Sequence, residues 1–526
     1  MAPRLPHGRP PHRVGKSLPT LLTLPTLLVL LTLLTGTTPA VAATPHEGSR
    51  TDRQRLARVD AHIRERMAAT GTPGAALAVV ERGRVTHTRG YGRDGDGRPV
   101  TPGTPFLWGS VAKPFTALTV TQLAEAGRLD LDDPVRAHLP WFRLADPDAS
   151  ARITVRHLLT HTSGLPRSAS DLVSDRYDNR PDGLRRAVRD LADVRPAAPP
   201  GRAYSYSSAG YAVLGALVEE LTGRPFATQL RREVLDPLRM RHAVATERDF
   251  RRQRVSPGHR QLLGHPVRFD APFDGSGTPY GYLGGTVGDL ARFARAQLNG
   301  GALDGQRVLS ARGVAETHRG QVASSGDHYG LGWSVTTLEG TGQRAVWHSG
   351  ALPGYQAMVV LLPDSDRAVI LLQNAFSVLR DRQFTDAAFG AAQILSGTHP
   401  TTTGADPLFT GLPWATCALV PLLLLALLAP ALRRPTARTP RTPRRTAVTG
   451  GLAVTGALGL TALLGWGLPA MVDSDLSTIA LWAPDLGWSV RAALVLAPLL
   501  ALQRLWLTAR RLHRARRSSP GGPVDA

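Results

Sequence analysis

The sequence has one cysteine and almost no lysine among its 526 residues. The single cysteine, Cys417, excludes an intrachain disulfide, so an exported domain of this chain must be stabilised by its hydrophobic core. Of the 62 Lys and Arg residues, only Lys16 and Lys113 are lysines. The sixteen histidines form no H-E-x-x-H or similar pattern, so we expect neither a metal site nor a cofactor.

The rarity of lysine makes Lys113 chemically informative. Arginine stays protonated at any accessible pH, whereas a desolvated lysine can lose its proton and act as a base. Lys113 follows Ser110 by three residues, and side chains at that spacing share one face of a helix. A base beside a serine is what an activated serine nucleophile requires. A lone S-x-x-K also arises by chance, so the pair needs support from other motifs.

Residues 1–43 have the layout of a secretory signal peptide. Basic residues precede a leucine-rich run over 18–34, and residues 40–42, Ala-Val-Ala, match a small-x-small cleavage site. The alternative is an uncleaved membrane anchor, although two prolines at 19 and 25 disfavour a long spanning helix. The basic residues are Arg4, Arg9, Arg13 and Lys16.

The C-terminal part, 406–526, holds three apolar stretches at about 408–432, 447–471 and 486–507. Each is close to the ~20 residues that cross a bilayer as a helix, so we expect three transmembrane helices. Eleven arginines occupy the loop after the first stretch and the tail after the third, whereas the remaining loop has three aspartates and no basic residue. The positive-inside rule makes the first loop and the basic tail cytoplasmic, and residues 44–405 extracytoplasmic. The arginines are Arg433, Arg434, Arg438, Arg441, Arg444, Arg445, Arg510, Arg511, Arg514, Arg516 and Arg517, and the aspartates are Asp473, Asp475 and Asp485.

The formal net charge of +21 would otherwise suggest a nucleic-acid partner. The excess instead belongs to the signal peptide and to the two cytoplasmic segments, where it orients the chain in a membrane. We therefore expect a lipid bilayer as partner and no nucleic acid.

Periodicity within 44–405 predicts an α+β domain. Strand patterns occur at both ends of this region, with helical patterns between them, which favours an antiparallel sheet flanked by helices and carrying a helical lobe. The predicted helices are 50–69, 113–127, 210–223, 289–299 and 378–395, and the predicted strands are 75–81, 84–91, 345–348, 356–362 and 368–373.

Two further segments complete a candidate site. Residues 204–211, Tyr-Ser-Tyr-Ser-Ser-Ala-Gly-Tyr, precede a predicted helix, and residues 346–351, Val-Trp-His-Ser-Gly-Ala, lie on a predicted strand. Together with 106–113 they resemble the motifs of the serine β-lactamase and penicillin-binding-protein superfamily, in its class C β-lactamase, D-aminopeptidase and esterase branch. That family has S-x-x-K at a helix start, Y-x-N before a second helix, and K-T-G or H-x-G on a core strand. The resemblance covers about residues 50–395.

The resemblance implies roles in acyl transfer. Ser110 would attack a carbonyl and form an acyl-enzyme, and Lys113 would take the serine proton. Tyr206 would pair with the lysine as general base and as acid for the leaving group. The backbone N–H groups of Ser110 and Ala351 would form the oxyanion hole. Tyr206 could alternatively be a core aromatic residue.

The resemblance also implies substrate contacts at Ser208, His348, Ser349 and Gly350. Ser208 stands where the family usually has asparagine, which weakens the case for recognising a penicillin side chain and leaves esters and D-amino-acid peptides open. A protonated His348 would favour a substrate carboxylate, although it could alternatively be a structural strand histidine. Gly350 would let the substrate approach the strand closely. His161 is expected to be structural and is not assigned to catalysis.

The sequence thus predicts an exported, multi-pass membrane protein with an extracytoplasmic serine hydrolase domain. It would cleave amide or ester bonds through an acyl-enzyme, as a β-lactamase, a D-alanyl-D-alanine carboxypeptidase or an esterase does. Its substrate would be a small molecule or a peptide, peptidoglycan-derived peptides included. The alternative is a non-catalytic, penicillin-binding-like sensor or scaffold of the cell envelope.

Overall fold

The computed structural model describes residues 47–324, 326–432 and 442–517. The expected signal peptide at 1–43 lies outside the described residues, as do the arginines at 433–441. The described residues from Gln54 onward form one compact unit, and residues 47–53 are the first turns of helix α1 (Glu47–Thr70).

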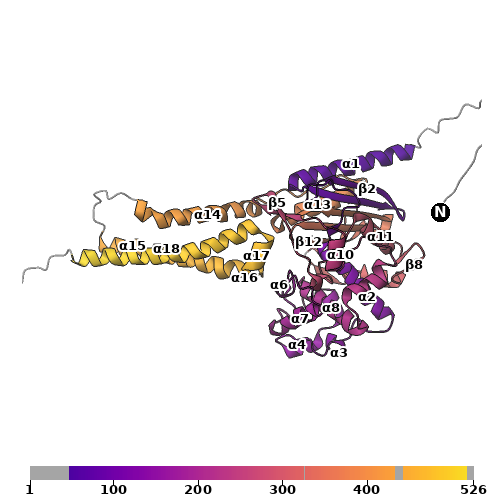
Figure 1. Cartoon of the computed structure of the whole chain (residues 1–526), viewed down its shortest axis with the longest axis horizontal. Coiled ribbons are helices and arrows are strands. Elements are labelled where there is room, and N and C mark those ends of the chain that lie inside the picture. The colour runs from indigo at the N-terminus through magenta and orange to yellow at the C-terminus, as the bar shows by residue number, and fades with distance from the viewer. Residues whose placement is uncertain (1–46, 325, 433–441, 518–526) are drawn as a thin grey trace, which may run out of the picture. The chain divides into compact units, whose positions relative to one another are not determined.

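The framework is an eight-stranded antiparallel sheet with strand order β2-β1-β14-β13-β12-β11-β10-β9 (Figure 1). The N-terminal hairpin therefore pairs with a late strand, β14, with Ala75 opposite Gln373. Among the late strands themselves, β12 pairs with β13, with Gly350 opposite Ala357. Central strand β13 is buried along its whole length because helices cover both faces of the sheet. The strands are β1 (Gly74–Glu81), β2 (Arg84–Gly92), β9 (Val322–Ser324), β10 (Asp327–Tyr329), β11 (Ser334–Thr337), β12 (Arg344–Leu352), β13 (Tyr355–Leu362) and β14 (Arg367–Gln373).

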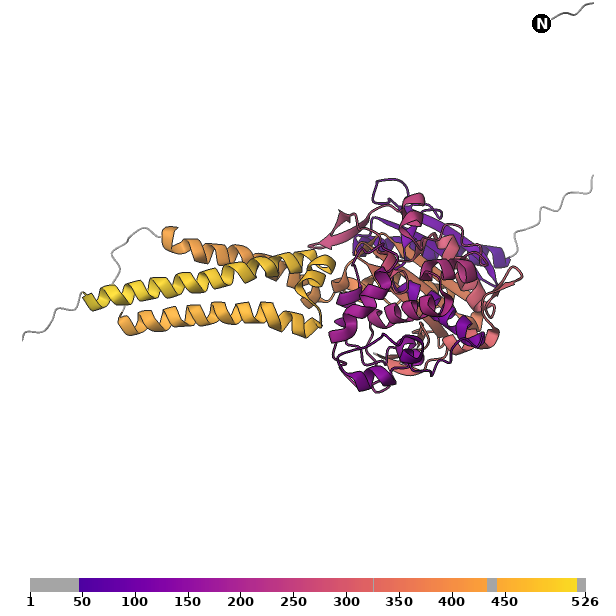
Figure 2. The same ribbon diagram turned by 60° about the horizontal axis from the view of Figure 1, so that its bottom comes forward.

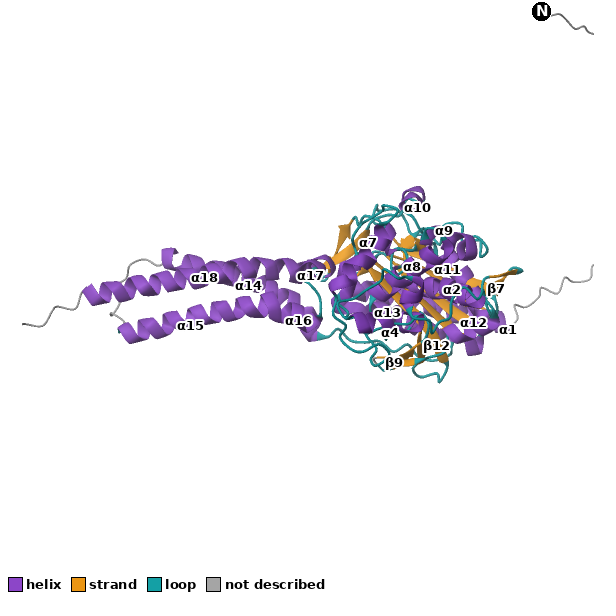
Figure 3. Ribbon diagram, turned by 90° about the horizontal axis from the view of Figure 1, so that it is seen from below, coloured by secondary structure: helices purple, strands orange, loops and turns teal. Residues whose placement is uncertain are grey.

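One face of the sheet is covered by α1 and α13 (Asp381–Leu395). Val59 and Ile63, four residues apart on α1, pack with Leu77, Val360 and Ala388 in one buried cluster. The other face carries α11 (Val287–Leu298) and the helical lobe, in which Figure 3 labels α2 (Ala112–Glu125) and α8 (Ser208–Thr222) and which Figure 2 shows from another side. The expected α+β fold with an antiparallel sheet and a helical lobe is confirmed.

Smaller elements complete the domain. The lobe contains α3 (Val135–His138), α4 (Pro147–Arg152), α5 (Val155–Leu159), α6 (Ala169–Val173), α7 (Gly183–Arg189), α9 (Phe226–Leu230), α10 (Glu247–Arg252) and α12 (Ala311–Thr317). The short strands are β3 (Phe106–Leu107) with β6 (Gly284–Gly285), β7 (Ala302–Leu303) with β8 (Gln306–Arg307), and β15 (Ala375–Phe376) with β4 (Gly258–Leu262) and β5 (His265–Phe269).

Three helical segments of the C-terminal part are long and apolar enough to cross a membrane: Pro407–Leu432, Pro443–Val472 and Pro484–Arg517. They correspond to α14 (Pro407–Leu432), to α15 (Pro443–Ala462) continued by a π-turn into α16 (Leu468–Val472), and to α18 (Pro484–Arg517). Helix α18 packs against both α14 and α15. A short helix, α17 (Leu476–Trp482), lies in the loop before α18.

Candidate active site

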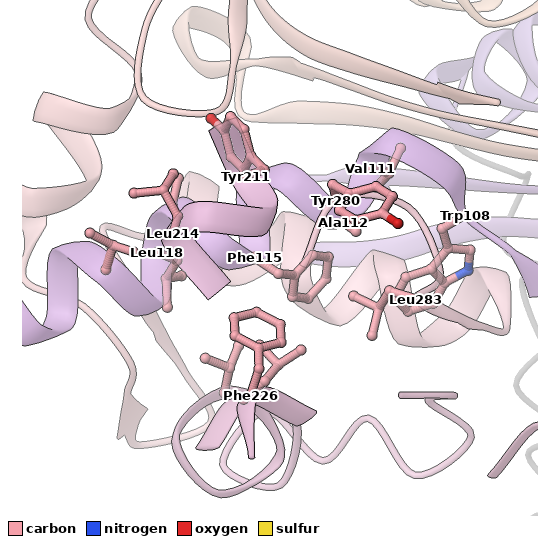
Figure 4. Packing of buried hydrophobic residues seen from close by; sticks show 14 of the residues in the cluster. Trp108, Val111, Ala112, Phe115, Leu118, Tyr211, Leu214, Phe226, Tyr280 and Leu283 are labelled. Carbon is pink, nitrogen blue, oxygen red and sulfur yellow. The ribbon is translucent and has the colours of Figure 1, made fainter. Parts of the chain in front are cut away.

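Ser110 lies in a tight turn at the start of the lobe's central helix. After β3 the chain turns at Gly109 (φ 54°) into the 3₁₀ turn η1 (Gly109–Val111), and α2 begins only at Ala112. The helix predicted over 113–127 therefore starts one residue earlier, at Ala112, and Ser110 lies before it in the 3₁₀ turn. Figure 4 shows part of the buried cluster around this turn, which includes Phe115 of α2 and Tyr211 of α8, and the Phe115 ring stacks on that of Trp108 with centroids 5.7 Å apart. This packing holds the turn in place.

Lys113 is fully buried, and its amine points at the serine. Its Nζ donates hydrogen bonds to Ser110 Oγ (3.0 Å), Ser208 Oγ (3.3 Å) and the carbonyl of Tyr280 (3.0 Å). Burial lowers the pKa of Lys113 to about 7, because the charged ammonium is desolvated. Near neutral pH about half of these amines are uncharged and able to accept a proton.

Tyr206 meets the serine with its hydroxyl and the lysine with its ring. Lys113 Nζ lies 4.8 Å from the Tyr206 ring centroid. Burial raises the pKa of Tyr206, and a side-chain hydrogen bond with Ser110 acts in the opposite direction. The tyrosine therefore contacts both residues of the S-x-x-K pair, and its contact with Lys113 is through the ring.

Strand β12 runs directly against the turn that carries Ser110. A Cβ on Gly350 would lie 1.9 Å from Trp108 O and 2.8 Å from Ser110 N, so only glycine fits there. A Cβ on Gly109 would lie 2.4 Å from Ala351 N. The turn that carries Ser110 therefore lies in close contact with residues 350–351 of β12, which is compatible with the oxyanion hole predicted from Ser110 and Ala351. Gly350 is therefore required by the backbone of residues 108–110, which occupies the space that a Cβ would fill. This requirement is separate from the predicted role of Gly350 in letting substrate approach the strand.

His348 is buried on β12 and uncharged. Its Nε2 lies 3.0 Å from the hydroxyl of Tyr329, and its Nδ1 lies 2.6 Å from the carbonyl of Ser349. Burial lowers the pKa of His348 to about 3, with a smaller contribution from the charge of Lys113. The imidazole is therefore neutral near pH 7, which removes the electrostatic reason for expecting it to favour a substrate carboxylate. The Ser349 side chain, by contrast, lies on the partly exposed side of the strand.

Ser208 is the first residue of α8 and lies at the site. Its Oγ accepts the bond from Lys113, and its backbone N–H donates to Ser170 Oγ (2.9 Å). The side chain is partly exposed, like those of Ser110 and Tyr206. Its contact with a substrate remains a prediction.

Three residues around the site were not assigned to it from the sequence. Tyr280 contributes only a backbone carbonyl, which carries no side-chain signal. Tyr329 contacts His348, and its Tyr-Gly-Leu-Gly-Trp segment also resembles the family, although the resemblance assigned Tyr329 no role in the site. His161 has a positive φ (57°), accepts a bond from Ser207 N (3.2 Å) at Nδ1, and lies 4.3 Å from Tyr206 between ring centroids. This is the structural position expected for it.

Comparison with known proteins agrees with this geometry. The family model described as Beta-lactamase matches residues 59–392. Penicillin-binding protein 4 of Amycolatopsis lactamdurans is 37% identical over 330 residues, which cover 60% of this chain and 85% of that protein. Protein flp of Staphylococcus aureus (strain MW2) is 28% identical over 309 residues, 57% of this chain and 59% of that protein.

Solved structures share the fold. The octameric penicillin-binding protein homologue from Pyrococcus abyssi superposes with a TM-score of 0.56 at 24% identity, covering 69% of this chain and 81% of that one. The D-alanine carboxypeptidase AmpC from Burkholderia cenocepacia superposes with a TM-score of 0.54 at 23% identity, covering 66% and 99%.

Proposed function

This chain belongs to the Beta-lactamase family, and we propose that it is a serine hydrolase that forms an acyl-enzyme at Ser110. The observation that carries the proposal is the contact of Ser110 Oγ with a fully buried amine, Lys113 Nζ, at 3.0 Å. The pKa of that amine, lowered to about 7, provides a base at neutral pH.

The proposed reaction has two steps. Ser110 Oγ attacks the carbonyl carbon while its proton passes to the neutral amine of Lys113, and the carbonyl oxygen becomes an oxyanion that the N–H groups of Ser110 and Ala351 stabilise. Collapse of this intermediate breaks the bond to the leaving group, which takes the proton held by Lys113 by way of the Tyr206 hydroxyl and so leaves the amine neutral again. Water then adds to the Ser110 ester, and its cleavage releases the acid and restores the serine.

For the substrate we propose an amide or ester that reaches the site past Ser208 and Ser349, both of which are partly exposed. The relative from Amycolatopsis is named for binding penicillin, which supports acyl-D-amino-acid peptides and their β-lactam analogues as candidates. Serine at 208 offers a shorter side chain with one donor, so we expect weak discrimination for the acylamide group.

We further propose that the hydrolase domain is exported and anchored by the three apolar helices. The arginine distribution supports this orientation. A contact supports it independently: Ser168 N of the hydrolase domain donates to Asp473 Oδ2 (3.1 Å), in the loop expected to be extracytoplasmic. That bond requires the domain and the loop to be on the same side of the membrane.

The test is covalent labelling of the full-length, detergent-solubilised protein with a fluorophosphonate and with a fluorescent penicillin, followed by peptide mapping. We expect an adduct on Ser110 that is absent from Ser110→Ala, while Ser365→Ala, in the turn after β13, still reacts. The probe that reacts faster identifies the better-matched chemistry. A wild-type protein that forms no adduct with either probe would contradict the enzyme assignment and favour the non-catalytic sensor.

A further inference from the structure

We propose that the outer loop, defined as residues 473–485 between α16 and the first turn of α18, is a positioning element of the active site. It acts through the wall segment, defined as residues 168–175 and containing α6. The inference rests on the proposed function, in which Lys113 is the base that activates Ser110, because it gives the membrane region a part in holding that lysine.

The outer loop binds the wall segment at both ends and in the middle. Polar groups of the outer loop form hydrogen bonds with polar groups of the wall segment, including the carboxylates of Asp171 and Asp175. The hydrogen bonds run from Ser168 N to Asp473 Oδ2 (3.1 Å), from Ser474 Oγ and Asp475 N to Asp171 Oδ2 (2.8 and 3.0 Å), and from Trp482 Nε1 to Asp175 Oδ2 (3.3 Å).

The opposite side of the wall segment binds the candidate site. Ser170 Oγ accepts the backbone N–H of Ser208 (2.9 Å), the residue whose side chain contacts Lys113. The carbonyl of Val173 accepts the hydroxyl of Tyr280 (2.6 Å), and the carbonyl of that tyrosine accepts Lys113 Nζ (3.0 Å). Two separate paths therefore lead from the wall segment to the lysine, each through a single residue.

Helix α6 is too short to hold this geometry alone. It has five residues, and an isolated helix of that length is unstable in water, so its order depends on tertiary contacts. Asp175, which follows it, has a positive φ (56°) and accepts bonds from Trp482 and from Tyr282 (2.5 Å). Its carboxylate is thus shared between the outer loop and the interior of the lobe.

The outer loop is itself anchored away from the wall segment. Arg260 donates to the carbonyl of Leu481 (3.1 Å), and Leu263 N donates to Asp485 Oδ2 (2.8 Å), both from the β4–β5 hairpin. The Trp482 ring packs edge-on against Phe376, with 6.0 Å between centroids. The loop therefore has a fixed position from which it can support the wall.

Loss of this support would admit water beside Lys113. The low pKa of the amine comes from burial, so partial solvation raises the pKa and leaves less neutral amine at pH 7. Acylation of Ser110 would slow at neutral pH, and its pH midpoint would move upward.

The experiment compares full-length wild type with the Ser474→Ala/Trp482→Phe double variant, which removes two donors and keeps an aromatic ring at 482. The control is Trp506→Phe, an exposed tryptophan farther along α18. Hydrogen–deuterium exchange of peptides covering 168–175 reports on the contact without requiring activity. Labelling of Ser110 by the faster probe, measured over pH 5–9, reports on the lysine.

We expect exchange in 168–175 to accelerate about fivefold or more in the double variant, the labelling midpoint to rise, and the control to match wild type. Unchanged exchange would overturn the contact. Faster exchange with an unchanged labelling rate and midpoint would overturn the positioning role. An absence of any adduct in wild type would contradict the proposed function, while the exchange comparison would still decide whether the loop holds the wall.

Discussion

The amine of Lys113 lies 3.0 Å from the hydroxyl of Ser110, in a position fully closed to solvent. A charged ammonium is disfavoured in such a position, whereas arginine could not lose its charge there. The composition bias against lysine and the burial of Lys113 therefore point to the same property, a basic amine available near neutral pH.

Acylation should follow the titration of that amine. The pKa of Lys113 is lowered to about 7. The fraction of neutral, active amine therefore falls as the pH drops below about 7 and approaches one well above about pH 7. We expect the second-order labelling rate of Ser110 to rise tenfold per pH unit below about 6 and to level off above about 8. Stopped-flow labelling over pH 5–9 measures this, and a rate that still rises tenfold per pH unit up to pH 9 would show an ordinary lysine.

Ser208→Asn should change substrate preference while leaving the reaction in place. Ser208 contacts Lys113, and its side chain is partly exposed, so an amide there can reach an acylamide group of the substrate. We expect kcat/KM for acyl-D-Ala-D-Ala peptides or penicillins to rise relative to simple esters, by about tenfold. Equal ratios in wild type and variant would place residue 208 outside the substrate contact.

Gly350→Ala should nearly abolish acylation. The new Cβ would lie 1.9 Å from Trp108 O, so β12 and the Ser110 turn must separate, which disturbs both expected oxyanion donors. Losing one such donor typically costs about 10²–10³-fold in rate. Labelling kinetics measure the loss, with Gly103→Ala as control because a Cβ there makes only ordinary contact. Activity within about threefold of wild type would contradict the geometry of the hole.

The topology can be checked in intact cells. A reporter fused after Ala526 should be cytoplasmic, and a tag inserted near Thr402 should be accessible from outside. The basis is the set of eleven arginines on one side of the apolar helices and three aspartates on the other. External protease that spared the hydrolase domain would contradict this orientation.

Local patterning accounts for the part of the fold that the sequence predicted. The hairpin β1–β2 and strands β13 and β14 combine apolar runs with glycine and aspartate turns, and their predicted bounds differ from the structure by at most one residue. Strands β9, β10 and β11 were not predicted, because they have three or four residues each and are only partly buried. Of the three, only β11 pairs with β12, and β10 and β9 are added in turn beyond it.

The motifs predicted which residues meet at the site, but not their environment. Ser110, Lys113 and Tyr206 come together as expected. The neutral state of His348 follows from burial, and the role of Tyr280 depends on a backbone carbonyl, so neither is visible in residue types. The bond between Trp482 and Asp175 joins residues 307 positions apart, which no local pattern predicts.

The most direct measurement is the labelling rate of Ser110 in full-length Lys113→Arg compared with wild type at pH 7–9. An arginine at 113 stays protonated at these pH values, whereas Lys113, with a pKa of about 7, is largely neutral, so the substitution removes the ability to act as a base. Our account predicts that the folded variant, verified by circular dichroism and thermal melting, forms the Ser110 adduct at least about 10²-fold more slowly than wild type. Acylation at the wild-type rate would show that the amine is structural and that Lys113 is not the base.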